Sequence, residues 1–140
     1  MQIPRKIIYM ERINYASGSK WEDIVGYSRA VKAGNFIEVS GTVASGPDGK
    51  VVGTDDARAQ TIYIYKKIEE VLKKAGSEMK DVIRVRMFVT DISRWQEYGE
   101  GHSQFFKQIK PCTTMVEVKA LIEPGYLVEI EATAIAPQNA

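Results

Sequence analysis

Two glutamates, Glu129 and Glu131, stand two positions apart in a segment rich in β-branched residues near the end of the sequence. Side chains two positions apart on a strand point to the same face, so the two carboxylates are expected to lie near each other. Such proximity raises the pKa of one carboxyl group and suits it to acid–base work. The alternative interpretation is structural, with both glutamates forming ion pairs at an interface.

Two arginines are candidates for binding an anionic ligand. Alternation along their strands places Arg86 and Arg29 on faces that could border a cleft, with Arg29 on the side of Tyr27. The alternative is that these arginines pair with Glu117 or Glu131 where subunits meet.

His102 and Cys112 are the only residues of their types in the chain. A histidine titrates near neutral pH and serves as a general base at a cleft. His102, however, falls on an apolar helical stripe with Tyr98 and Phe106, which favours a histidine hydrogen-bonded within the packing. Cys112 lacks a flanking cation or helix start that would lower its pKa, so we expect a small buried hydrophobic side chain. These two residues cannot build a Cys/His metal cage, and we expect neither a metal nor a cofactor.

The composition limits the classes of function. The 140 residues suit a single domain over 1–140, and a hydrophobic content of 44% is enough for its core. Nineteen basic against eighteen acidic residues leave a net charge of +1, which is not the basic surface of a nucleic-acid or anionic-membrane binder. No segment approaches the ~18 apolar residues of a membrane span, and the start lacks a signal-peptide core. A cytoplasmic protein is therefore expected.

Hydrophobic periodicity predicts elements in the order βββ-α-β-α-ββ. Strands are expected over 6–13, 27–32, 35–43, 82–90, 112–121 and 127–136, and helices from a cap at Thr54 or Asp55 to Gly76 and over about 93–107. Gly34 can take the positive φ of a tight hairpin turn between the second and third strands. Both helices are expected to cover the aliphatic face of one sheet, which is an α+β architecture.

The opposite face of the sheet is predicted to be mixed in character. It would carry Glu38, Ser40, Arg86, Glu117, Lys119, Glu129 and Glu131 among Tyr27, Phe36, Phe88 and Met115. Such a surface is too polar for a dry core and too aromatic for a plain solvent face. An oligomer interface that encloses a polar cleft would explain it.

Several motifs, in this order along the chain, resemble those of the Rid family, also called YjgF or RidA. They are Val39-Ser40-Gly41, a Pro-Asp-Gly turn at 47–49, Gly76 after the first helix, Met-Phe-Val-Thr-Asp-Ile at 87–92, Pro-Cys-Thr-Thr-Met-Val-Glu-Val at 111–118, and Pro124-Gly125 before Leu-Val-Glu-Ile-Glu-Ala-Thr-Ala at 127–134. The match covers 26–136. The resemblance implies a chorismate-mutase-like fold, a mixed sheet with two helices on one face, and a homotrimer with ligand clefts between neighbouring subunits.

The resemblance also implies an activity, the hydrolysis of reactive enamines and imines to 2-keto acids and ammonia without a metal or organic cofactor. Position by position, Tyr27 and Ser40 match cleft residues of the family, with Gly41 beside the serine. Glu129 matches the glutamate associated with the attacking water.

One position departs from the family pattern. Thr113 stands where the family has an arginine that binds the substrate carboxylate, and Met115 on the same strand is a further candidate lining residue. A threonine hydroxyl cannot reproduce a bidentate guanidinium contact. The sequence thus resembles branches that lack the arginine, and Arg86 or Arg29 is a candidate replacement.

We therefore expect a homotrimer that binds a small carbonyl or imine metabolite and hydrolyses it with water positioned by Glu129. The alternative is a non-catalytic ligand-binding or regulatory trimer, because Thr113 replaces the anchoring arginine. A third class, endoribonuclease or translation inhibitor, is a label attached to parts of the family and is disfavoured by the balanced charge.

Overall fold

The computed structural model describes residues 10–137, and within them the elements follow the predicted order βββ-α-β-α-ββ. The strands and main helices are β1 (Arg12–Tyr15), β2 (Ala30–Ala33), β3 (Phe36–Thr42), α1 (Ala57–Lys74), β4 (Val82–Val89), α2 (Trp95–Phe106), β5 (Cys112–Glu117) and β6 (Val128–Ile135), with short helical turns η1 (Glu22–Gly26), η2 (Met79–Asp81) and η3 (Ile92–Arg94). Half of the strand expected over 6–13, residues 6–9, lies outside the described residues, and β1 ends two residues later than expected.

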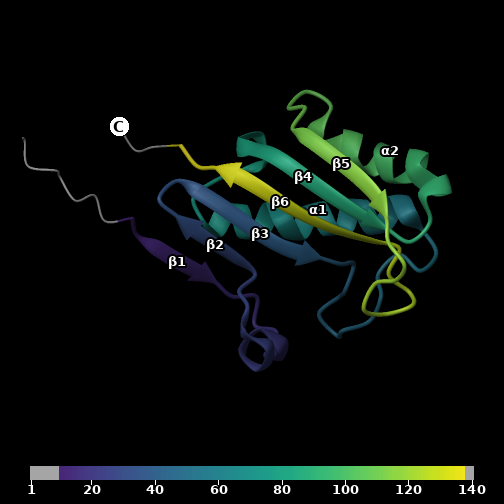
Figure 1. The fold of residues 1–140 in the computed structure, drawn as a ribbon, viewed down its shortest axis with the longest axis horizontal. Coiled ribbons are helices and arrows are strands. Elements are labelled where there is room, and N and C mark those ends of the chain that lie inside the picture. Colours follow the sequence, from purple (N-terminus) through teal and green to yellow (C-terminus); the bar gives the residue numbers. More distant parts are fainter. Residues whose placement is uncertain (1–9, 138–140) are drawn as a thin grey trace, which may run out of the picture.

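The described strands form one mixed sheet in the order β1-β2-β3-β6-β4-β5 (Figure 1). Neighbouring strands pair antiparallel except β4 and β5, which are parallel. A parallel pair needs a crossover connection, and α2 supplies it. Because β6 lies between β3 and β4, the last strand carries Glu129 into the middle of the sheet.

Both helices lie on one face of the sheet, as predicted, and the core lies between the two layers (Figure 1). Its helical side includes Ile64, Tyr65, Ile68, Leu72, Tyr98 and Phe106, and its strand side includes Ile37, Val39, Val85, Met87, Val89, Ile130 and Ala132. The strand residues alternate along β3, β4 and β6, so the period-two pattern identified this buried face correctly.

The ends of α1 follow ordinary capping chemistry. The side chain of Asp56 accepts a hydrogen bond of 2.9 Å from the Ala59 amide, so the cap lies one residue beyond the expected Thr54 or Asp55. Gly76 follows the helix with φ +78°, the left-handed conformation predicted for its end. Gly34 likewise takes φ +62° in the hairpin between β2 and β3.

The sheet face opposite the helices carries the predicted mixture of charged and aromatic side chains. Register pairs Phe88 with Glu129, Arg86 with Glu131, and Glu38 with Thr133 on this face. We call it the open face. It is where the site described below is formed.

Met115 and Glu117 lie on the other side of the sheet, so their expected place on the open face is wrong. The parallel register sets Met115 level with Met87 and Glu117 level with Val89, both core residues. Met115 packs against the core, and Glu117 accepts a hydrogen bond from the amide of Ile92, the first residue of η3. Alternation shows which residues share a face, but only the pairing with β4 decides which face that is.

Candidate functional site

Glu129 lies directly over Gly41 on the open face. An irregularity in the pairing of β3 with β6, between Val39 and Thr42, places Gly41 beside the glutamate. A Cβ atom built at position 41 would lie 2.9 Å from Glu129 Oε1. Glycine therefore leaves the space that the carboxylate occupies, a use of glycine and of bulges that is common next to functional sites.

Arg29 holds the backbone of β3 at Gly41. Its Nη2 donates a hydrogen bond of 2.6 Å to the carbonyl oxygen of Gly41. Burial lowers the pKa of Arg29, while the charges of Tyr27, Glu22 and Glu129 act in the opposite direction. Its Nε is buried without a hydrogen-bond partner among the described residues. The guanidinium of Arg29 is thus used in a hydrogen bond to the backbone next to Glu129.

The pKa of Glu129 is raised. Burial is the largest cause, the negative charge of Glu131 adds to it, and the positive charge of Arg29 opposes it. A carboxyl group with a raised pKa exchanges protons closer to neutral pH than an exposed glutamate does. The charge of Glu131 acts on Glu129 in the predicted direction, but burial is the larger cause of the raised pKa.

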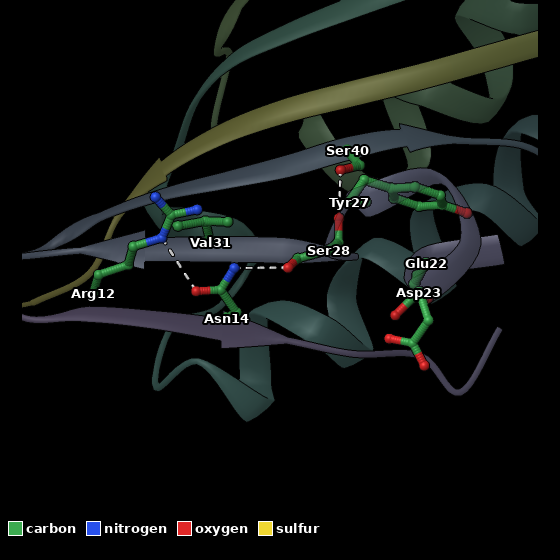
Figure 2. A pocket seen from close by; sticks show the side chains of 9 residues that line it. Arg12, Asn14, Glu22, Asp23, Tyr27, Ser28, Val31 and Ser40 are labelled. Carbon is green, nitrogen blue, oxygen red and sulfur yellow. Dashed lines mark hydrogen bonds between the residues drawn. The ribbon is translucent and has the colours of Figure 1, made fainter. Parts of the chain in front are cut away.

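A cavity of about 490 Å³ opens on the same face over β1, β2 and β3. It is lined by Arg12, Asn14, Glu22, Asp23, Gly26, Tyr27, Ser28, Val31 and Ser40 (Figure 2). The structure therefore brings the predicted Tyr27 and Ser40 together in one pocket. Arg12 and Asn14 are not among the residues that the sequence predicts for the site, because the sequence pattern ends the first strand at residue 13 and does not show which face its side chains occupy.

Polar contacts connect the lining residues of this pocket (Figure 2). Ser40 Oγ donates to the carbonyl of Ser28 at 2.7 Å, and Asn14 Nδ2 donates to Ser28 Oγ at 2.8 Å. Arg12 Nε donates to Asn14 Oδ1 at 3.2 Å. The chain of contacts runs from β3 through the segment before β2 to β1 and holds the pocket wall in one arrangement.

Arg86 pairs with Glu131 within one subunit, at 3.4 Å from Nη1 to Oε1. Glu131 was one of the two predicted partners of Arg86, but the pair forms within one subunit, and a pairing between subunits stays a prediction. Both side chains are partly exposed, and such pairs contribute little to stability. Neighbouring Arg84 donates from Nη2 to Thr114 Oγ1 at 2.7 Å.

Thr113 lies on the helix side of β5, level with Val85 and away from Glu129. The Thr113 hydroxyl donates to the Pro111 carbonyl oxygen at 3.0 Å. Thr113 Oγ1 also lies 3.5 Å from His102 Nε2. Within one subunit, Thr113 and Met115 are therefore not brought together with the other predicted site residues. Their contribution to a ligand site stays a prediction.

His102 is hydrogen-bonded within the packing, as expected. Its Nδ1 lies 2.6 Å from the hydroxyl of Tyr65, a side chain that is fully buried. Burial lowers the pKa of His102, so the neutral imidazole is favoured. The expectation for Cys112 is wrong, because the thiol lies exposed. The register of β5 with β4 sets Cys112 level with Arg84, on the face of the sheet away from the helices.

Within residues 10–137, no group of three or more His, Cys, Asp or Glu side chains is arranged to hold a metal ion. In the same part of the chain, no helix has the length and apolar character needed to cross a membrane.

Comparison with known proteins places this chain in a family. Residues 17–136 match the family model described as Endoribonuclease L-PSP. A RutC family protein of Pyrococcus abyssi is 33% identical over 108 residues, which covers 77% of this chain and 84% of that protein. The crystal structure of a Mycobacterium tuberculosis member of the YjgF/YER057c/UK114 family aligns with a TM-score of 0.82 at 51% identity, over 90% of this chain and 100% of that chain. A Rid-family protein of Yersinia pestis aligns with a TM-score of 0.76 at 31% identity, over 88% of this chain and 94% of that chain. This chain belongs to the YjgF/RidA/RutC family.

Proposed function

We propose that the protein is a homotrimer that binds a small carbonyl or imine metabolite in a cleft between subunits and hydrolyses the imine. The observation that carries this proposal is the position of Glu129 over Gly41, with its pKa raised by burial, on the sheet face opposite the two helices of the described residues. Family membership supports the same reading, because Glu129, Tyr27 and Ser40 match the positions that the resemblance singles out.

Hydrophobic side chains that are exposed in a single subunit support the proposed homotrimer. Phe36, Val116 and Tyr27 are 49%, 43% and 39% exposed on or beside the open face. Large exposed hydrophobic side chains among charged ones are typical of an interface that also encloses polar groups. We expect light scattering to give three times the 15.7 kDa mass of the chain, and a monomer at working concentration would contradict the proposal.

The chemistry that we propose needs one proton acceptor and one water molecule. The imine reacts as its protonated form, the iminium ion. The ionised carboxylate of Glu129 takes a proton from water as the water oxygen bonds to the iminium carbon, which gives a neutral carbinolamine. Glu129 then returns this proton to the amine nitrogen. The carbon–nitrogen bond breaks as the hydroxyl oxygen forms the carbonyl and gives its proton to Glu129, and that proton leaves with ammonia as ammonium. The raised pKa makes Glu129 a stronger base than an exposed glutamate.

The direct test is the release of ammonia from freshly generated 2-aminoacrylate. Glu129→Gln keeps the size of the side chain and removes the base, so we expect the rate to fall by a factor of about 100 or more. Glu70→Gln, on the exposed face of α1, is the matched control and should leave the rate unchanged. A wild-type rate no higher than that of buffer would eliminate the hydrolase.

A non-catalytic ligand-binding trimer is the second candidate, and the position of Thr113 favours it. No guanidinium stands at that position, and its hydroxyl faces His102 on the helix side. This candidate predicts that a 2-keto acid such as 2-oxobutanoate raises the melting temperature while no ammonia is released from the imine. Turnover that depends on Glu129 would exclude it.

The description of the family model names an endoribonuclease, and that activity is the third candidate. A net charge of +1 gives no general attraction for RNA. The test is whether RNA cleavage elutes with the trimer and is lost in Glu129→Gln. Cleavage that separates from the protein on further purification would exclude this candidate.

A further inference from the structure

Two basic side chains bind the backbone where β3 ends. Arg29 Nη2 donates to the carbonyl oxygen of Gly41 at 2.6 Å. Lys67, on α1, donates from Nζ to the carbonyl oxygens of Val43 and Ser45, at 3.1 Å each. The two cations therefore bind three alternate carbonyl groups, next to the irregularity in the pairing of β3 with β6. Side-chain donors thus hold the backbone where the strand pairing is interrupted.

Of these two cations, Arg29 is the one that shares a residue with Glu129. Glu129 Oε1 lies 2.9 Å from the position of a Cβ atom on Gly41, and the carbonyl of the same glycine accepts the hydrogen bond from Arg29. No ion pair joins the guanidinium to the carboxylate within residues 10–137. A single glycine of β3 therefore lies between the two charged groups.

The place of Arg29 is unfavourable for a charged side chain taken alone. Burial lowers the pKa of its guanidinium, and its Nε is buried without a hydrogen-bond partner in the described part of the chain. A buried donor without a partner is rare in native proteins and calls for an explanation. The hydrogen bond to Gly41 and the negative charge of Glu129 are interactions that favour the charged guanidinium here.

Within the described residues, two charged side chains act on Glu129. Burial is the largest cause of its raised pKa, the positive charge of Arg29 lowers the pKa, and the negative charge of Glu131 raises it. Phe88, level with Glu129 on β4, is uncharged, and Arg86, level with Glu131, pairs with that glutamate. The adjoining residue of β3 is a glycine. Arg29 is thus the cation that favours the ionised form of Glu129.

We propose that Arg29 is a positioning residue for Glu129, which fixes the carboxylate through the backbone of Gly41 and supplies the positive charge that keeps it ionised. The inference rests on the proposed function, because a base has to be ionised to accept the proton of water. It gives Arg29 a role other than binding a ligand carboxylate. All the contacts involved lie within one subunit, so the role does not depend on which groups stay exposed in the trimer.

The experiment is a carbon NMR titration of the Glu129 carboxyl group in the full-length protein and in three variants of Arg29. Arg29→Met removes the charge and the donor, Arg29→Gln removes the charge and keeps an N–H donor, and Arg29→Lys keeps the charge. Glu129→Gln identifies the resonance by its absence.

We expect the pKa of Glu129 to be higher than in wild type in Arg29→Met and Arg29→Gln, and close to wild type in Arg29→Lys. If Arg29→Met does not fold, Arg29→Gln and Arg29→Lys still separate the effect of the charge. A pKa that is unchanged in Arg29→Gln, or that rises equally in Arg29→Lys, would overturn the proposal.

Lys67→Met is the matched control. It removes a half-buried cation that binds carbonyl groups of the same segment, but the charge of Lys67 is not among the causes of the raised pKa of Glu129. We expect a lower melting temperature and an unchanged pKa of Glu129. A rise in this pKa as large as in Arg29→Gln would show that loosening the segment is sufficient, and would contradict a specific effect of Arg29.

Imine hydrolysis tests the positioning of Glu129. At a pH at which Glu129 is ionised in both proteins, we expect Arg29→Met to hydrolyse 2-aminoacrylate about tenfold more slowly than wild type, because the carboxylate is displaced. The acid limb of its rate profile should also lie at higher pH. A wild-type rate for Arg29→Met at that pH would overturn the positioning role.

The two proposals fail separately, because the NMR titration needs no turnover. If the wild type does not hydrolyse the imine but the pKa of Glu129 rises in Arg29→Gln, only the hydrolytic function is lost. If hydrolysis depends on Glu129 and its pKa is the same in all the variants of Arg29, the role of Arg29 is wrong.

Discussion

The carboxylate of Glu129 fills the space in which a side chain at Gly41 would begin, with Oε1 2.9 Å from the position of the missing Cβ atom. Arg29 Nη2 donates a hydrogen bond to the carbonyl oxygen of the same glycine. Glu129 and Arg29 therefore both contact Gly41, and the backbone of β3 at this glycine determines where the Glu129 carboxylate lies.

Gly41→Ala should displace the Glu129 carboxylate while the fold remains intact. The new methyl group meets the end of a flexible side chain, which can move away, so we expect a melting temperature within a few degrees of wild type. We expect imine hydrolysis to fall about tenfold or more, because the base is no longer in position. Gly99→Ala, whose methyl group meets open space, is the control. Full activity in Gly41→Ala would contradict the assigned role of Glu129.

Glu131→Gln should lower the pKa of Glu129. The negative charge of Glu131 is one of the causes that raise this pKa, so its removal favours the ionised form of Glu129. The acid limb of the rate profile should therefore move to lower pH. Carbon NMR of the Glu129 carboxyl group measures the same shift without turnover. An unchanged or higher pKa would show that the two carboxylates do not interact.

Alanine at Gly101 and at Gly99 should change stability in opposite directions. A Cβ atom at Gly101 would lie 2.8 Å from Thr61 Cβ, where α2 packs closely on α1, so Gly101→Ala should cost about 1–3 kcal/mol. No atom lies within 4 Å of a Cβ atom at Gly99, so Gly99→Ala should stabilise the helix by roughly 0.5–1 kcal/mol. Urea unfolding measures both, and the same sign for the two variants would contradict the packing described.

Gln60→Leu should be strongly destabilising. The buried amide donates to the carbonyls of Gly53 and Gly125 at 3.1 and 3.0 Å and accepts from the Leu127 amide at 2.9 Å. Leucine leaves these three backbone groups without a partner, and we expect a loss of about 3 kcal/mol or more in the free energy of unfolding. Gln96→Leu, at an exposed position of α2, is the control and should change stability by less than about 0.5 kcal/mol.

His102 should make the protein less stable at low pH. Burial lowers its pKa in the folded state, so the unfolded chain takes up a proton first as the pH falls below about 6.5. The contribution of His102 to stability is complete above that pH and is lost as the pH falls toward its folded-state value. Urea unfolding at pH 7.5 and pH 5.0 should therefore show a larger loss for wild type than for His102→Gln. An equal loss in the two proteins would show that His102 titrates normally.

The sequence by itself determined the order of the elements, the buried faces of β3, β4 and β6, and the mixed open face that carries Glu129. These features are local, because side-chain alternation and capping depend on neighbours along the chain. Only the tertiary structure decided that Met115 and Glu117 turn to the helix side, since that depends on the parallel register of β5 with β4. The same holds for the exposure of Cys112, because the same register sets this residue level with Arg84 on the open face. The pocket between Arg12 and Asp23 also arises only when β1 pairs with β2, because residues distant in sequence meet through hydrogen bonds that no local pattern encodes.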